Sequence, residues 1–188
     1  MKRVIMVSLM VLLALPVMGS AKDMTGKYGL GYFNTDAPVG ARFWVAPKVG
    51  IDVGVGFKME DVYVGAQPEK QSASSFWIEA GVPFVIFPSE RANFFVRPGV
   101  VLGLLDDRSY GTGNLDSKWT LLSFSLTPGA EIFFGDQFSL EAGHGIALDM
   151  LMVPDEDGIP TYRRGETETT IRSFDASVTY LGFHFYFK

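Results

Sequence analysis

The chain has no cysteine and only two histidines among its 188 residues. The lack of cysteine excludes a disulfide scaffold, a thiolate metal site and a cysteine nucleophile. An excess of positive charge is also missing, because 16 Lys and Arg stand against 21 Asp and Glu, for a formal net charge of −5. Since a nucleic-acid-binding domain is expected to carry a basic surface, the composition predicts no nucleic-acid partner.

Long apolar runs are absent except at the start of the chain. Lys2 and Arg3 precede an apolar stretch from 4 to 17, and small residues follow at 19–21. This order is typical of a cleaved secretory signal peptide. The run is shorter than the roughly 20 residues of a membrane-spanning helix, and Pro16 interrupts it. We therefore expect a signal peptide at 1–21 and one mature domain at 22–188, with 14 basic and 21 acidic residues and a charge of −7.

Alternation of apolar with small or charged residues dominates the mature chain. In 49–59, Ile51, Val53 and Val55 alternate with Asp52 and Gly54, the period of a half-buried strand. Eight such segments occur, at 26–34, 38–46, 49–59, 74–87, 93–105, 118–134, 137–149 and 172–187. No helix candidate separates them, so hairpins are the simplest connections. The predicted fold is all-β, an eight-stranded antiparallel up-and-down transmembrane β-barrel.

The connections between the segments alternate in length. The second, fourth and sixth are tight, whereas the third, fifth and seventh are long and polar. Outer-membrane barrels have short periplasmic turns and long extracellular loops, which is the same two-ended arrangement. Only the first connection, Asn34 to Pro38, is shorter than that rule predicts.

Glycine indicates which face is enclosed. Residues such as Gly54, Gly81 and Gly129 share a face with the charged residues, where an exposed outer wall would only lose strand propensity. A narrow eight-stranded lumen, in contrast, needs small residues beside any enclosed charge. The predicted lumen charge network is Lys27, Arg42, Asp52, Lys58, Glu79, Arg97, Glu131, Glu141, Asp149 and Asp175. Enclosed charges must be paired, and we expect Arg97 to pair with Glu79 or Glu131.

Several stretches resemble a known family. They are Gly40-Ala41-Arg42-Phe43-Trp44-Val45, the run from Val49 to Phe57, Pro128 to Phe134, and Leu140-Glu141-Ala142-Gly143. Together they are similar to the outer membrane protein beta-barrel domain family of Gram-negative bacteria. The closing run Leu181 to Phe187 resembles the aromatic last strand that the barrel-assembly machinery recognises, although Lys188 follows it here. The resemblance implies passage past periplasmic chaperones to the outer membrane, and it implies no shared activity.

Catalytic and ligand-binding patterns are weak. By alternation His144 falls on the apolar face, and the parity of His184 is ambiguous and suggests a bulge near Tyr180. Neither histidine has a nucleophile placed beside it along its strand, so no enzyme is expected. The acidic run 155–158 lacks the spacing of a dedicated calcium loop, and no cofactor or metal is predicted. Arg163 and Arg164 in the last loop are candidate contacts for lipopolysaccharide phosphates.

Four functions remain open, because a fold does not determine a function. The leading hypothesis is a non-enzymatic outer-membrane protein with a structural or surface-interaction role through its loops, in contact with outer-membrane lipid and lipopolysaccharide. A narrow conduit for small hydrophobic molecules would need a lateral opening or a lumen patch such as Phe95, Val101 and Leu105. A soluble periplasmic barrel binding an apolar ligand would invert the two faces. A lipid-modifying hydrolase would need a catalytic set at the rim.

Overall fold

The computed structural model describes residues 22–34, 37–63, 70–106, 118–155, 165–173 and 179–187. Within these residues, one antiparallel sheet contains β1 (Tyr28–Tyr32), β2 (Val39–Ala46), β3 (Val49–Tyr63), β4 (Lys70–Gly81), β5 (Phe84–Pro88), β6 (Ala92–Asp106), β7 (Lys118–Phe133), β8 (Phe138–His144), β9 (Ile146–Met152), β10 (Thr167–Arg172) and β11 (Thr179–Phe187). In this described part, no helix is long and apolar enough to cross a membrane.

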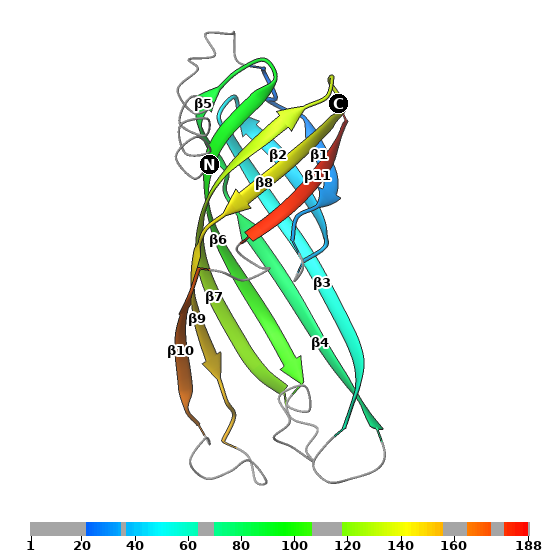
Figure 1. Ribbon diagram of the computed structural model, residues 1–188, viewed down its shortest axis with the longest axis vertical. Helices are drawn as coiled ribbons and strands as arrows, with labels where there is room; N and C mark the ends of the chain where they lie inside the picture. The colour runs from blue at the N-terminus through cyan, green and yellow to red at the C-terminus, as the bar shows by residue number, and fades with distance from the viewer. Residues whose placement is uncertain are drawn as a thin grey trace, which may run out of the picture.

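The eleven strands form a closed barrel of eight staves (Figure 1). A stave is here one position in the barrel wall, occupied by one strand or by two consecutive strands. β4 and β5 together form one stave, which pairs with β6. β8 and β9 form a second stave, which pairs with β7. β10 and β11 belong to the last stave. The barrel closes where β1 pairs antiparallel with β11. The predicted all-β, eight-stranded antiparallel barrel is confirmed.

The barrel has two different ends. The end with the connections β2 to β3, β5 to β6 and β7 to β8 is here called the turn end, and the opposite end the loop end. At the loop end, the connections β3 to β4 and β6 to β7 (64–69 and 107–117) and residues 156–164 of the connection β9 to β10 lie outside the described part.

One stave is interrupted for a reason that the sequence contains. Pro83 has no backbone N–H and cannot continue a ladder as a donor. The chain steps out of the sheet at this point: Val82 N–H donates to the Pro98 carbonyl at 3.0 Å, and Gly50 N–H donates to the Pro83 carbonyl at 3.0 Å. These two hydrogen bonds keep the Val82 N–H and the Pro83 carbonyl paired at the interruption.

Alternation along the strands separates buried from exposed side chains. In β3, Asp52 and Gly54 are buried whereas Val53 and Val55 are exposed. The buried positions face the lumen and the exposed ones face outward. The inward glycines leave room for charged side chains: a Cβ added at Gly81 would lie 2.4 Å from Cζ of Arg97. The sequence signal from glycine therefore has a direct steric cause.

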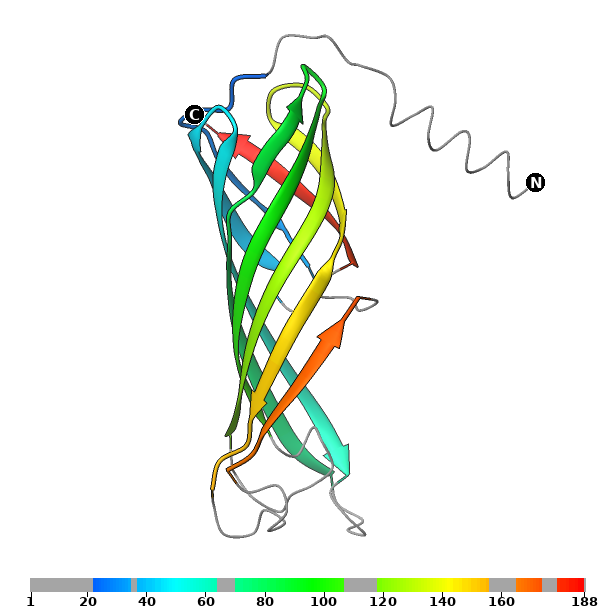
Figure 2. The ribbon, with the colours of Figure 1, turned by 90° about the vertical axis from the view of Figure 1, so that its left-hand side faces the viewer.

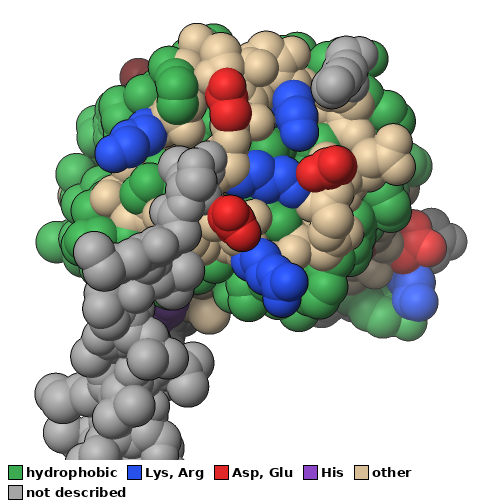
Figure 3. Space-filling model, turned by 90° about the horizontal axis from the view of Figure 1, so that it is seen from above, with side chains coloured by type: hydrophobic (Ala, Val, Ile, Leu, Met, Phe, Trp, Pro, Cys, Tyr) green, Lys and Arg blue, Asp and Glu red, His purple; other side chains and the backbone are tan. Residues whose placement is uncertain are grey.

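The turn end of the lumen is closed by an apolar cluster and by the segment that precedes β1. The cluster comprises Met24, Trp44, Val85, Phe95, Phe133 and Tyr186. Gly26 N–H donates to the Trp44 carbonyl at 2.8 Å, which ties the segment across the mouth. Seen from this end, Lys or Arg side chains alternate with Asp or Glu over the face (Figure 3).

The last stave corrects one prediction. β11 keeps an unbroken register against β8 from Thr179 to Phe185, so the bulge expected near Tyr180 is not present in this described strand. Tyr180, Gly182, His184 and Tyr186 consequently share the inward face, and His184 is fully buried. The stave also begins earlier than predicted, because β10 starts at Thr167.

Candidate functional site: a buried charge cluster in the lumen

Six charged side chains meet inside the turn-end half of the barrel, and all are buried. They are Arg42, Asp52, Glu79, Arg97, Glu131 and Glu141, which we call the charge cluster. Strand pairing brings them together two at a time: Arg42 of β2 lies beside Asp52 of β3, and Glu131 of β7 lies beside Glu141 of β8. Every member was among the residues predicted to line the lumen.

Arg42 is the centre of the cluster. Its Nε donates to Oδ1 of Asp52 at 2.7 Å and its Nη2 to Oδ2 at 2.8 Å, a bidentate pair. The same guanidinium reaches across the lumen to Oε2 of Glu131 at 3.4 Å and forms an ion pair with Glu141. The N–H donors of its planar guanidinium therefore connect β2 to three other strands, β3, β7 and β8.

Arg97 extends the cluster toward β4. Its Nε donates to Oδ2 of Asp52 at 2.6 Å, and its Nη1 lies 2.6 Å from Oε1 of Glu79. Glu79 also accepts a hydrogen bond from the side-chain amide of Asn34. Of the two partners expected for Arg97, Glu79 contacts it, whereas Glu131 is engaged by Arg42 instead.

The two adjacent carboxylates of Glu131 and Glu141 are held by hydroxyl groups as well. Oε1 of Glu131 accepts from Ser139 at 2.6 Å and from Tyr186 at 2.6 Å. Oε1 of Glu141 accepts from Tyr180 at 2.5 Å. These donors satisfy oxygens that Arg42 alone would leave underbonded, which a buried carboxylate requires.

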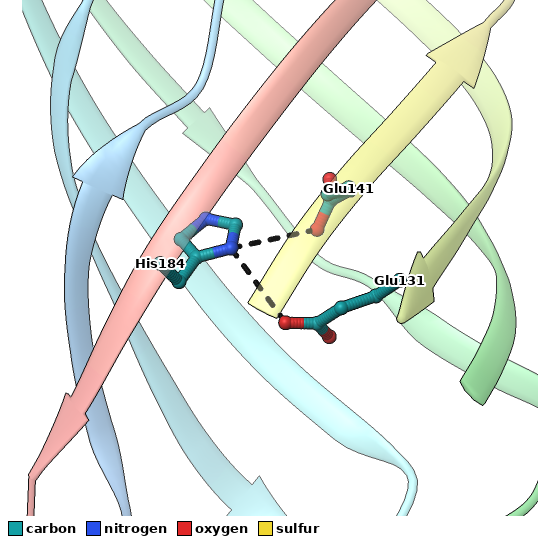
Figure 4. Close-up of side chains that lie close together, drawn as sticks. All are labelled: Glu131, Glu141 and His184. Carbon is teal, nitrogen blue, oxygen red and sulfur yellow. Dashed lines mark ion pairs between the residues drawn. The ribbon is translucent and has the colours of Figure 1, made fainter. Parts of the chain in front are cut away.

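His184 faces both carboxylates (Figure 4). Its Nδ1 lies 3.6 Å from Oε1 of Glu131 and 3.9 Å from Oε2 of Glu141, beyond hydrogen-bonding distance. The ring packs edge-on against Phe33, with centroids 4.8 Å apart. Glu131, Glu141 and His184 could hold a cation, since their ligand atoms lie within 4.8 Å of one another. Arg42 and the hydroxyl groups already occupy those carboxylates, so the arrangement is that of an ion-pair network.

The remaining predicted residues lie apart from the charge cluster. In the loop-end half Asp149 forms an ion pair with Arg172, and Lys58 lies 2.8 Å from Glu60. Lys27 is half-buried just before β1 at the turn end. Asp175, Arg163 and Arg164 lie outside the described residues. Outside the predicted network, His144 is exposed with its Nδ1 2.6 Å from the hydroxyl of Thr179.

A second, apolar cluster occupies the loop-end half of the lumen. Leu105, Trp119 and Val153 form its buried part, with Trp77, Leu121 and Leu151 packed against it. The lumen patch that a hydrophobic conduit could use, Phe95, Val101 and Leu105, is divided, because Phe95 belongs to the turn-end cluster with its ring 5.8 Å from Cζ of Arg42.

Sequence reasoning missed three polar members of the site: Tyr180, His184 and Tyr186. Simple alternation from 180 to 187 would have found them, because all three share one parity with Gly182. Asn34 and Ser139 were missed for a different reason, since nothing in a sequence distinguishes an inward Asn or Ser that binds a carboxylate from one that does not.

Fold and site together define an eight-stranded antiparallel β-barrel whose lumen is filled by a buried ion-pair network. No protein-family model, curated protein or solved structure matches the chain.

Proposed function

We propose that the protein is a non-enzymatic outer-membrane barrel that spans the lipid bilayer with a closed lumen and acts at the cell surface through its loop end. The observation that carries this proposal is the inversion of the two faces. Phe57 and Leu181 are 63% and 67% exposed on the outside, whereas Arg42 and Glu131 inside are 0% exposed. A water-soluble protein rarely exposes a continuous apolar perimeter, while a bilayer requires one.

Aromatic pairs at the turn end support this placement. Tyr28 stacks on Phe187 with ring centroids 5.6 Å apart, and Phe138 lies 5.0 Å from Phe185. Tyrosine and phenylalanine rings of this kind form the girdle at a membrane interface. At the loop end, the exposed side chain of Lys118 pairs with the buried carboxylate of Asp106 at 2.9 Å.

The long strands have the length that this role requires. β6 has 15 residues. At about 3.3 Å per residue and a tilt of about 40°, such a strand rises roughly 38 Å, more than the apolar band of about 25 Å on outer-membrane barrels. A stave of this length can therefore cross the hydrocarbon and still project beyond it at the loop end, whereas β1 and β2, with 5 and 8 residues, are shorter.

The charge cluster favours a closed lumen and argues against an axial pore. Its members pair with one another and pack against aromatic rings of the turn-end cluster. An ion moving along the axis would have to separate these pairs in a space of low dielectric constant, which costs several kcal/mol. In this proposal the partners are lipid and lipopolysaccharide, with chaperones and the barrel-assembly machinery acting during biogenesis.

A conduit for small hydrophobic molecules is the second candidate. The apolar cluster of Leu105, Trp119 and Val153 favours it. Since the charge cluster and the turn-end cluster close the axis, such a path would have to pass through the wall.

Cell fractionation with and without detergent tests the leading proposal. We expect the mature chain in the outer-membrane fraction, released by detergent and not by high salt, and we expect no ion conductance when it is reconstituted in a planar bilayer. Recovery of the folded protein from the periplasm without detergent would overturn the proposal and favour the soluble barrel. Stable conductance steps would overturn the closed lumen while leaving the membrane location intact.

A further inference from the structure

His184 is a buried polar side chain that the ion-pair network does not use. The residue is 0% exposed. Neither Nδ1 nor Nε2 of its ring donates or accepts a hydrogen bond among the described residues. Folding removes the water that would otherwise hydrogen-bond to the imidazole, and a nitrogen left without a partner costs free energy. The Nδ1 lone pair is therefore available to a ligand.

The fold directs this ring at two carboxylates. His184 lies on β11, two residues after Gly182, which pairs with Glu141 of β8. Glu141 in turn pairs with Glu131 of β7. β11 is the red strand in the turn-end half of the barrel (Figure 2). Three neighbouring strands of the wall, β7, β8 and β11, thus each direct one potential metal ligand toward the same point (Figure 4).

Packing fixes the ring in this orientation. Gly31 of β1 pairs with His184, and a Cβ added at Gly31 would lie 2.9 Å from Cδ2 of the imidazole. The ring therefore fills space that the glycine leaves. Phe33 packs edge-on against the same ring, with centroids 4.8 Å apart. Such packing preorganises a side chain for binding, because the ring does not have to be ordered by the ligand.

The charge cluster carries more negative than positive charge. Its two arginines stand against four carboxylates, which gives a formal charge of −2 when His184 is neutral. Among the described residues, no other Lys or Arg forms an ion pair with these four carboxylates. Excess charge of one sign is unfavourable in a buried site, and one divalent cation would cancel it.

The distances suit metal coordination. Nδ1 of His184 lies 3.6 Å from Oε1 of Glu131 and 3.9 Å from Oε2 of Glu141, and the three ligand atoms lie within 4.8 Å of one another. Two atoms bound to one ion at about 2.1 Å each lie about 3.0 to 4.2 Å apart, depending on the coordination angle. The separations are too long for hydrogen bonds, yet they fall in the range that a shared ion requires.

The contacts already made by the two carboxylates leave each of them able to bind an ion. An ionised carboxylate offers about four acceptor positions. Hydroxyl groups together with Arg42 use three of them on Glu131 and three on Glu141. One position on each carboxylate remains, and the existing donors hold both groups in place as the outer partners of a metal site do.

We propose that Glu131, Glu141 and His184 bind one divalent transition-metal ion, of which Zn²⁺ is the representative. An imidazole nitrogen with two carboxylate oxygens suits Zn²⁺, whereas Ca²⁺ and Mg²⁺ prefer oxygen ligands alone. The ion joins β7, β8 and β11 beside the seam at which β11 pairs with β1. Because the site is buried, the ion is taken up as the barrel folds, and it stabilises the folded state. The inference does not depend on the proposed membrane location.

The metal content of refolded protein tests the site. The untagged mature chain is refolded from urea into micelles with or without excess Zn²⁺, then treated briefly with EDTA and desalted to remove ions from the surface. We expect about one zinc ion per chain by mass spectrometry, and a higher urea midpoint than for protein refolded without metal. Only two histidines are present, so His184→Gln should retain almost no zinc, whereas the matched control His144→Gln, at an exposed position, should retain the full amount.

A second measurement covers the case in which His184→Gln fails to fold, shown by loss of its compact form on a cold detergent gel. In the His144→Gln protein His184 is the only histidine, so labelling with nitrogen-15 histidine gives its ring signals alone. Zn²⁺ present during refolding should shift the Nδ1 signal. Failure of the wild-type protein to retain zinc, equal retention by a folded His184→Gln protein, or an unchanged Nδ1 signal would each overturn the proposal. None of these results bears on the membrane location, which cell fractionation tests separately.

Discussion

Replacing Arg97 by methionine should destabilise the barrel through the carboxylate that it leaves behind. Arg97 contacts Asp52 and Glu79, each at 2.6 Å. After the substitution Asp52 keeps its bidentate pair with Arg42, whereas Glu79, among the residues that the structure describes, retains only the amide of Asn34. Removing one partner of a buried ion pair typically costs about 3–5 kcal/mol, and we expect a loss in this range in the free energy of unfolding.

Neutralising the stranded carboxylate should recover part of that loss. In a double-mutant cycle of Arg97→Met with Glu79→Gln, we expect a coupling energy of about 2 kcal/mol, within the range observed for residues in direct contact. The matched control is Arg97→Met with Glu131→Gln, because Glu131 has Arg42, Ser139 and Tyr186 as its partners. That cycle should be closer to additive.

The assay is urea unfolding in micelles, followed by tryptophan fluorescence, with the slope of the transition compared among all variants. Additivity within about 0.5 kcal/mol in the Glu79 cycle would refute the reasoning, because it would mean that solvent screens Arg97 from its neighbour.

Three further substitutions or treatments have definite outcomes. Ile78→Lys, at an outward position of β4, should impair insertion by about 2–4 kcal/mol in a refolding titration, whereas Trp77→Lys, at the inward neighbour, should impair it less; equal effects would contradict the assigned faces. Boiled and unboiled samples should migrate differently on a cold detergent gel, because the pairing of β1 with β11 leaves no free edge between the first and last strands from which the barrel could unfold. Identical migration would argue against a stable barrel. Gly81→Val should lower the free energy of unfolding by about 1–3 kcal/mol, because the valine side chain would enter the space of the Arg97 guanidinium. Ala80→Val, on the outward face of the same strand, should be nearly neutral in the same urea assay. Similar effects at both positions would contradict the steric role of Gly81.

The fold was accessible from sequence because one physical signal repeats along the chain. Period-two alternation locates the staves, and glycine on the charged face identifies the lumen, as the position of Gly81 beside Arg97 shows. The breaks within staves were harder to predict. Pro83 predicts one of them, whereas Gly145, at the interruption before Ile146, is a weaker signal because glycine is frequent throughout these strands.

The sequence predicts which charged residues line the lumen, but not which of them pair with one another. Arg42 and Asp52 are cross-strand neighbours on consecutive strands, so their pairing follows from a short hairpin. The contact between Arg42 and Glu131 spans the lumen between β2 and β7, and it depends on barrel closure and side-chain reach that alternation does not encode. The hydrogen bond from Asn34 to Glu79 likewise depends on side-chain reach across the barrel, which alternation does not encode.

Accessibility of nitroxide labels tests the central claim, that lipid surrounds the apolar face and the charged face is enclosed. The chain has no cysteine, so single cysteines can be introduced at Phe124, Ser125, Leu126 and Thr127 of β7 without a background signal. In reconstituted vesicles, labels at 124 and 126 should be accessible to oxygen and shielded from a water-soluble nickel complex, while labels at 125 and 127 should be shielded from both. Access of the nickel complex to labels at 124 and 126, or oxygen access that favours 125 and 127, would contradict the account.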